Sequence, residues 1–291
     1  MSEICALCGV EAPLQISHII PGFAIDRLRE TSVGLRSAQT PNRRVQDGVK
    51  VSLLCAACET HLSKWEKLFF ERIYVPLNEN DSEYPRLPYE DWALKFTVSV
   101  SWRVLTFYDR QGLLSSFTEE QTQAVSTALE VWREFILGKL PHPAEFEQHL
   151  YPFDYLMGHS QAVSPYINRY VLRTIDMDVV VSPKSFFVYT KLSRVILVGF
   201  LRQPNLRFWR GGKIHVRKGI VGSAGYGVPT EFLEYINDKA NHAGEAFSNL
   251  SPKQSLSVEQ RIIQKGDVFM ESETFRAMSQ DEKLSRVAPI E

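Results

Sequence analysis

The chain has no cysteine after residue 58, although it is 291 residues long. Cysteines that merely fill a core would be spread along the whole chain, so an early cluster is expected to serve one local purpose. The chain also lacks a run of the roughly 18 apolar residues that a membrane-spanning helix requires. Its longest apolar run, 195–201, has the length of a buried strand.

A strong charge of one sign is also missing, because 33 basic side chains stand against 34 acidic ones. No overall electrostatic field therefore favours nucleic acid or a membrane, and any such partner must be recognised by a local patch. The first residues show no basic segment followed by an apolar one, so we expect a cytoplasmic protein without a membrane partner.

The pattern of apolar residues predicts an α+β fold in two parts. Residues 1–77 form a small N-terminal module, 78–91 are a polar linker with two prolines, and 92–291 form a larger α+β companion domain of unknown role. Within the companion domain we expect helices at 92–108 and 119–140. We also expect an antiparallel sheet of three or four strands, at 174–182, 185–192, 194–201 and 213–221. The polar last 20 residues are expected to be loosely ordered.

Two C-x-x-C pairs, in the first 58 residues, predict a structural zinc site with the ligands Cys5, Cys8, Cys55 and Cys58. Zinc prefers four thiolate or imidazole ligands in a tetrahedron, and each C-x-x-C turn presents two sulfur atoms to it. Four sulfur ligands leave no open position, so this zinc would brace the fold and take no part in chemistry. The alternative is four unrelated free cysteines.

The order of these motifs resembles that of the HNH, or His-Me finger, endonucleases. The resemblance covers about residues 4–75 and is carried by a C-x-x-C pair, the segment His18-Ile-Ile-Pro, and a strand that leads into Leu-Leu-Cys-Ala-Ala-Cys-Glu at the start of a helix. It implies a zinc-braced ββα-metal module that cleaves phosphodiester bonds. No single one of these motifs would identify the family.

The resemblance assigns roles to two residues. One lies between the two C-x-x-C pairs, and the other directly follows the second pair, at the start of the expected helix. His18 matches the general base, which takes a proton from the attacking water, and Glu59 matches a ligand of the catalytic Mg²⁺ or Mn²⁺ ion. The chain departs from the family at Ser17, where an aspartate commonly supplies a second ligand, and at Lys50, where an asparagine commonly orients the base. A half-buried structural histidine and a helix-terminal acid are the alternatives for His18 and Glu59.

Basic residues suggest where nucleic acid could bind. Arg43 and Arg44 belong to a basic stretch between the two C-x-x-C pairs that could hold a phosphate backbone, or could simply be a solvated surface. A second basic stretch, 202–219, contains no acid and includes Phe208 and Trp209, which suits either base stacking or a charged edge hairpin.

The sequence therefore predicts a metal-dependent HNH-type endonuclease, a hydrolase that acts on nucleic acid, with DNA expected before RNA. By analogy, a role in phage defence would suit a small nuclease module with a larger companion domain. The companion could bind a regulatory protein or a second copy of the chain. The alternative function is a catalytically inactive zinc-binding module that holds nucleic acid or a protein partner.

Overall fold

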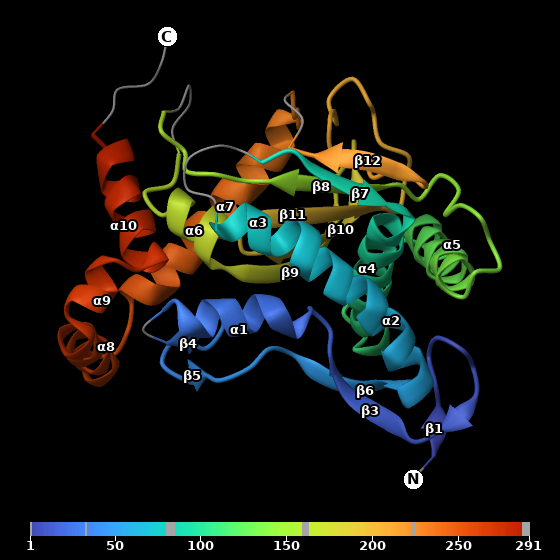
Figure 1. The fold of residues 1–291 in the computed structure, drawn as a ribbon, viewed down its shortest axis with the longest axis horizontal. Coiled ribbons are helices and arrows are strands. Elements are labelled where there is room, and N and C mark those ends of the chain that lie inside the picture. The colour runs from blue at the N-terminus through green and yellow to red at the C-terminus, as the bar shows by residue number, and fades with distance from the viewer. Residues whose placement is uncertain (1, 33, 80–84, 159–162, 223–224, 287–291) are drawn as a thin grey trace. The chain divides into compact units, whose positions relative to one another are not determined.

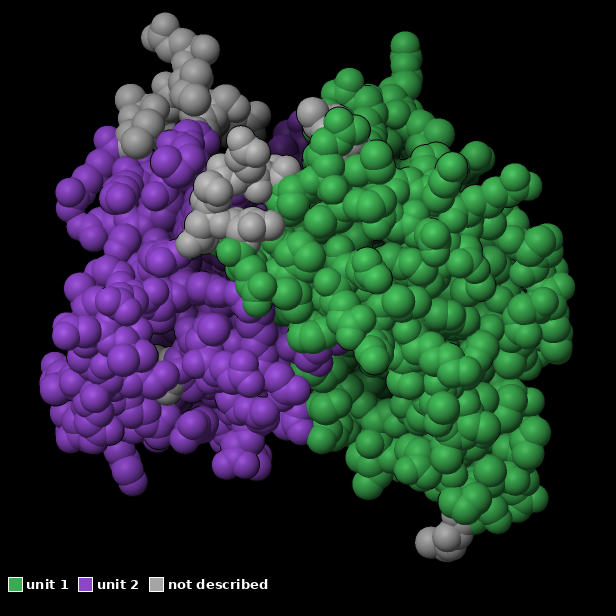
Figure 2. Space-filling model, in the orientation of Figure 1, with its two compact units in different colours: residues 1–22, 49–152, 176–227 green, residues 23–48, 153–175, 228–291 purple. Residues whose placement is uncertain are grey.

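The computed structural model describes the whole chain except residues 1, 33, 80–84, 159–162, 223–224 and 287–291. Helices and antiparallel sheets are both present, which confirms the mixed α and β character expected from the sequence. The chain folds into two compact units, drawn in green and purple in Figure 2. The first unit comprises 1–22, 49–152 and 176–227, and the second comprises 23–48, 153–175 and 228–291.

The N-terminal part of the first unit consists of two short antiparallel strand pairs and a helix (Figure 1). Strand β1 (Glu3–Ile4) pairs with β2 (Glu11–Ala12), and β3 (Leu14–His18) pairs with β6 (Lys50–Cys55), both antiparallel. Helix α2 (Ala56–Phe69) starts directly after β6. The chain therefore places one C-x-x-C pair beside the first hairpin and the other at the junction of β6 and α2.

The β3–β6 ladder contains an irregularity between Gln15 and Ile16, which pair with Leu54 and Ser52 and leave Leu53 without a partner residue. Such a bulge lets two consecutive side chains of one strand face inward. Leu53 and Leu54 are in fact both buried. The carbonyl of Leu53 accepts a hydrogen bond from the Ala6 amide at 3.1 Å, so the bulge attaches the first C-x-x-C turn to the strand.

The helix that begins with α2 continues through Pro76, although helices commonly end before a proline. A π-helical turn, η1 (Phe70–Tyr74), follows α2 and leads into α3 (Val75–Glu79). Pro76 comes directly after this π-helical turn, in which the Val75 amide donates to the Phe70 carbonyl. A proline interrupts the regular α-helical hydrogen bonding, and a π-helical turn is one of the distortions found at such interruptions.

The rest of the first unit is built on one four-stranded sheet and two helices. The strand order is β8 (Gln148–Pro152), β11 (Val195–Phe200), β10 (Phe186–Leu192) and β9 (Ile175–Val181). Helix α4 (Asp91–Arg110) packs on this sheet, on α2 and on α5 (Glu119–Ile136). The two predicted helices and three of the predicted strands are confirmed, within a few residues at their ends.

The fourth strand of the sheet was assigned wrongly. We expected 213–221 to join the sheet as a strand, but only Lys213 forms a bridge, with His149 of β8. The last part of the segment forms β12 (Lys218–Val221), which pairs with β7 (Leu87–Glu90) in a separate two-stranded sheet. Strand β8 takes the fourth place instead. It is short and follows a segment with two prolines, so its apolar pattern was too brief to be recognised.

The second unit is mainly helical. It contains most of α1 (Gly22–Glu30), the hairpin of β4 (Leu35–Arg36) and β5 (Arg44–Val45), and the helices α6 (Ile167–Arg173), α7 (Thr230–Ser248), α8 (Pro252–Lys265), α9 (Asp267–Met270) and α10 (Glu273–Leu284). Helix α6 packs on α7 and α10. The Asp281 carboxylate of α10 accepts hydrogen bonds from the Asn168 and Arg169 amides. Because α10 lies within the last 20 residues, our expectation of a loosely ordered end was wrong for 273–284.

The boundaries 1–77, 78–91 and 92–291 stay a prediction, and within the expected linker residues 80–84 lie outside the described part of the chain. Every helix in the described ranges is too short or too polar to cross a lipid bilayer.

Candidate metal centre and active site

The four cysteines come together in one cluster in which all four Sγ atoms lie within 4.8 Å of one another. A tetrahedral zinc with Zn–S bonds of about 2.3 Å requires S–S separations of about 3.8 Å. The Sγ atoms of Cys8 and Cys55 are 3.8 Å apart. The cluster could therefore hold a metal ion such as zinc, as the spacing of the C-x-x-C pairs predicts.

The surroundings of the cluster favour a bound cation. Burial opposes the ionisation of Cys5, yet the amides of Cys8, Cys55 and Leu7 donate to its sulfur and lower its pKa to about 7. Burial and the neighbouring sulfur atoms raise the pKa of Cys58. Four thiolates cannot form together at neutral pH without a positive charge among them, and a metal ion such as zinc would supply that charge.

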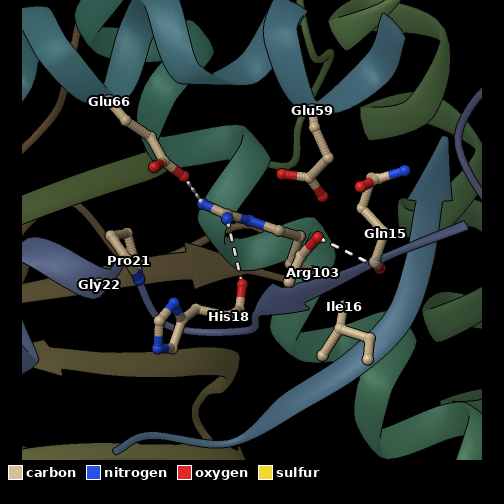
Figure 3. A pocket seen from close by; sticks show the side chains of 9 residues that line it. Gln15, Ile16, His18, Pro21, Gly22, Glu59, Glu66 and Arg103 are labelled. Atoms are coloured by element: carbon tan, nitrogen blue, oxygen red, sulfur yellow. Dashed lines mark hydrogen bonds and ion pairs between the residues drawn. The ribbon is translucent and has the colours of Figure 1, made fainter. Parts of the chain in front are cut away.

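A pocket of about 330 Å³ opens beside β3 and the start of α2 (Figure 3). Its lining is strongly polar and includes a histidine, two carboxylates and an arginine, namely Gln15, Ile16, Ser17, His18, Pro21, Gly22, Glu59, Glu66 and Arg103. The two residues that the HNH resemblance singles out, His18 and Glu59, thus line one pocket. They reach it from two different elements, β3 and α2.

Glu59 has one carboxylate oxygen that is left without a partner. Its Oε1 atom is buried and makes no hydrogen bond. Burying a carboxylate oxygen without compensation is costly, so such an atom marks a place where a cation or a donor belongs. In Figure 3 the Glu59 carboxylate points from α2 into the pocket. This chemistry fits a hard divalent ion.

His18 stands at the end of β3, where the chain turns into α1, and its ring lies against the backbone of Gly22. A Cβ atom at Gly22 would be only 3.1 Å from the His18 Nδ1 atom. A side chain at position 22 would therefore require the imidazole to shift by a few tenths of an ångström. Ser17 is half-buried, and its hydroxyl donates to the Gln15 carbonyl at 3.3 Å.

Arg103 is the residue of this site that sequence reasoning missed. It comes from α4, where its side chain is only 4% exposed. Its guanidinium donates to the His18 carbonyl at 3.3 Å and to the Glu66 carboxylate at 2.5 Å (Figure 3). Arg103 therefore ties β3, which carries His18, to α2, which carries Glu59. A charged residue inside an otherwise buried helical stretch was the signal that could have revealed it.

The remaining candidates lie elsewhere. Arg43 and Arg44 are both exposed and belong to the second unit. In the basic stretch 202–219, Trp209 is 2% exposed and packs against Phe200, so it offers no surface for base stacking. Phe208 is 54% exposed. His61 on α2 donates from Nε2 to the Ile136 carbonyl and does not line the pocket.

The comparisons with known proteins add no family to this picture. No protein-family model, curated protein or solved structure matches the chain. The site must therefore be interpreted from its own geometry and chemistry.

Proposed function

We propose that the chain is a metal-dependent endonuclease of the HNH type, whose N-terminal module is braced by a structural zinc. The single observation that carries this proposal is the pocket that His18 and Glu59 line together, with a buried Glu59 oxygen left unpaired. The four-cysteine cluster in the same module supports it, because a closed sulfur shell explains how so small a set of elements is held in place.

In this proposal His18 acts as the general base and Glu59 as a metal ligand. The imidazole takes a proton from a water molecule, whose oxygen forms a bond to phosphorus while the bond from phosphorus to the leaving sugar oxygen breaks. A bound Mg²⁺ or Mn²⁺ ion would supply positive charge to the phosphate oxygens. Glu59 would hold that ion through the oxygen that otherwise has no partner.

The substrate in this proposal is nucleic acid, DNA in the first instance, and a role in phage defence is the biological setting that such a nuclease suits. A regulatory protein or a second copy of the chain could control it through the companion domain. These parts of the proposal follow from the resemblance of residues 4–75 alone.

A second candidate function is a zinc-braced module that binds nucleic acid or protein without cutting. Two observations favour it. Ser17 offers only a neutral hydroxyl, and that hydroxyl is already directed to the Gln15 carbonyl. The Arg103 charge lies in the same pocket as Glu59, and a cation there opposes a second positive ion.

Changing Glu59 to glutamine tests the role of the metal ligand. We expect Glu59→Gln to raise the Mg²⁺ or Mn²⁺ concentration required for half-maximal cleavage by at least about tenfold, since the neutral amide is a poorer ligand for a hard ion. Titration of each metal in a cleavage assay with single- and double-stranded DNA and RNA measures the effect. Glu71→Gln, an exposed acid of η1, is the control.

Two outcomes would favour the non-catalytic binding module over the nuclease. One is a wild-type protein that cuts none of these substrates with either metal. The other is equal metal dependence in the wild type and Glu59→Gln.

Changing Arg103 to lysine tests whether Arg103 positions the site. Lysine keeps the positive charge beside Glu66 but cannot also reach the His18 carbonyl with a second donor, so β3 and α2 lose their common tie. We expect kcat to fall by about 100-fold with little change in KM, because small displacements of a catalytic group are costly. Steady-state kinetics with Arg110→Lys, an exposed residue at the end of α4, as the control would check this. An unchanged kcat would reduce Arg103 to a purely structural role.

A further inference from the structure

The small hairpin of β4 and β5 in the second unit brings two arginines face to face. Arg36 of β4 is paired directly with Arg44 of β5 in the antiparallel register. Like charges at directly opposed positions destabilise a strand pair, and a two-stranded hairpin is only marginally stable in water. The hairpin therefore carries a repulsion that something else must compensate.

A third arginine from a distant part of the chain joins this pair. Gly34 precedes β4, and a Cβ atom placed on it would lie 3.2 Å from Nη1 of Arg261 and 3.4 Å from Nε of Arg44. Arg261 belongs to α8, which also contacts the hairpin region through a hydrogen bond from the Ser251 amide to the Asn42 side chain. The guanidinium groups of Arg44 and Arg261 therefore both lie next to Gly34, and Arg36 is the strand partner of Arg44.

The hydrogen bonds of the Arg36 guanidinium go to neutral groups. Arg36 donates to the Pro41 carbonyl at 2.8 Å and to the Gln254 side-chain oxygen at 2.9 Å. Within the part of the chain that the structure describes, Arg36, Arg44 and Arg261 have no carboxylate at ion-pair distance. Burial lowers the pKa of Arg36, and the charges of Arg261 and Arg44 lower it further.

We propose that Arg36, Arg44 and Arg261 form a binding site for a phosphate group. Guanidinium groups match phosphate oxygens with paired donors, and an anion among three of them removes their mutual repulsion. The phosphate comes either from the sugar–phosphate backbone of a nucleic acid or from free phosphate. The site stands on the cluster itself, and only its nucleic-acid source rests on the proposed nuclease function.

Thermal unfolding in phosphate and in chloride at equal ionic strength tests the site. We expect phosphate to raise the Tm of the wild type by roughly 2–4 °C over chloride, because a ligand of the native state stabilises it. Arg44→Gln and Arg261→Gln should lose this difference. Lys253→Gln, which removes one positive charge from an exposed position of α8, should keep it.

The Tm values of the same variants in chloride show whether the arginines form a binding site or only support the fold. In chloride, Arg44→Gln and Arg261→Gln should melt at the wild-type temperature or above it, because each removes a like charge. Arginines that merely support the fold would give the opposite sign. A lower Tm for both variants in chloride, together with no phosphate effect in the wild type, would overturn the proposal.

Binding of an oligonucleotide identifies the source of the phosphate. We would use a His18→Ala background without added divalent metal, so that cleavage plays no part, and measure affinity against salt concentration. Arg44→Gln and Arg261→Gln should each reduce the slope of log K against log salt by about one unit. Lys253→Gln, an exposed residue of α8, should leave the slope unchanged.

Each combination of results has a meaning. A reduced slope together with the phosphate effect assigns the site to a nucleic-acid backbone, and a phosphate effect without a change in slope assigns it to free phosphate. Failure of both measurements rejects the site, whether or not the protein proves to be a nuclease. Failure of the nuclease assays alone leaves it standing.

Discussion

His18→Ala is expected to abolish Mg²⁺- or Mn²⁺-dependent cleavage while the protein stays folded. The imidazole is the proposed base, and its loss removes proton transfer that is worth about 10²–10⁴-fold in rate. His18 is not one of the four sulfur ligands, so the cluster of cysteines should remain intact. A gel-based cleavage assay with each metal, run beside a zinc determination and a thermal melt, measures all three expectations.

His142→Ala is the matched control, since His142 is exposed and does not line the pocket. It should cut like the wild type. His18→Ala should still bind nucleic acid, because the general base takes part in the cleavage step and does not bind the sugar–phosphate backbone. Full activity in His18→Ala would remove the HNH mechanism from consideration.

Cys55→Ser is expected to release the metal and loosen the N-terminal hairpins. The purified wild type should carry about one zinc per chain, and a serine hydroxyl cannot replace a thiolate in the shell. Residues near the cluster, such as Leu7 and Leu54, would then lose the cross-link that keeps them buried. Elemental analysis and limited proteolysis should show the zinc content falling and new cleavage sites before residue 58.

The four-stranded sheet should remain protected in Cys55→Ser, because β8, β10 and β11 pack on α4. Helix α5 is a less independent reference, since its Arg133 donates to the Leu7 carbonyl in the first C-x-x-C turn. Ser63→Ala, an exposed residue of α2, is the control. A wild-type protein without zinc after purification under reducing conditions would contradict the metal site.

Local patterns predicted much of this fold. The C-x-x-C spacing anticipated the convergence of the four sulfur atoms, and helical periodicity located α4 and α5 to within a few residues. His18 and Glu59 could be proposed as candidates because each stands at a fixed offset from a recognisable motif, and both line one pocket. Such features depend on neighbours in the chain, which a sequence displays directly.

Features that depend on distant parts of the chain could not be predicted. Arg103 reaches the pocket from α4, and Arg261 joins the hairpin arginines from α8. No local pattern links either residue to its partners. Trp209 shows the same limit, since its basic neighbours suggested a surface position while packing against Phe200 buries it.

The bulge in β6 determines which changes of length the module can tolerate. Deleting Leu53 would leave the pairs on either side of it in register, so the ladder itself would become regular. The deletion would, however, remove the carbonyl that receives the Ala6 amide and one of two adjacent buried leucines. A homologue with one residue fewer in this strand would therefore need a different attachment for its first C-x-x-C turn, whereas the polar segment 37–43 could vary in length at little cost to the β3–β6 ladder.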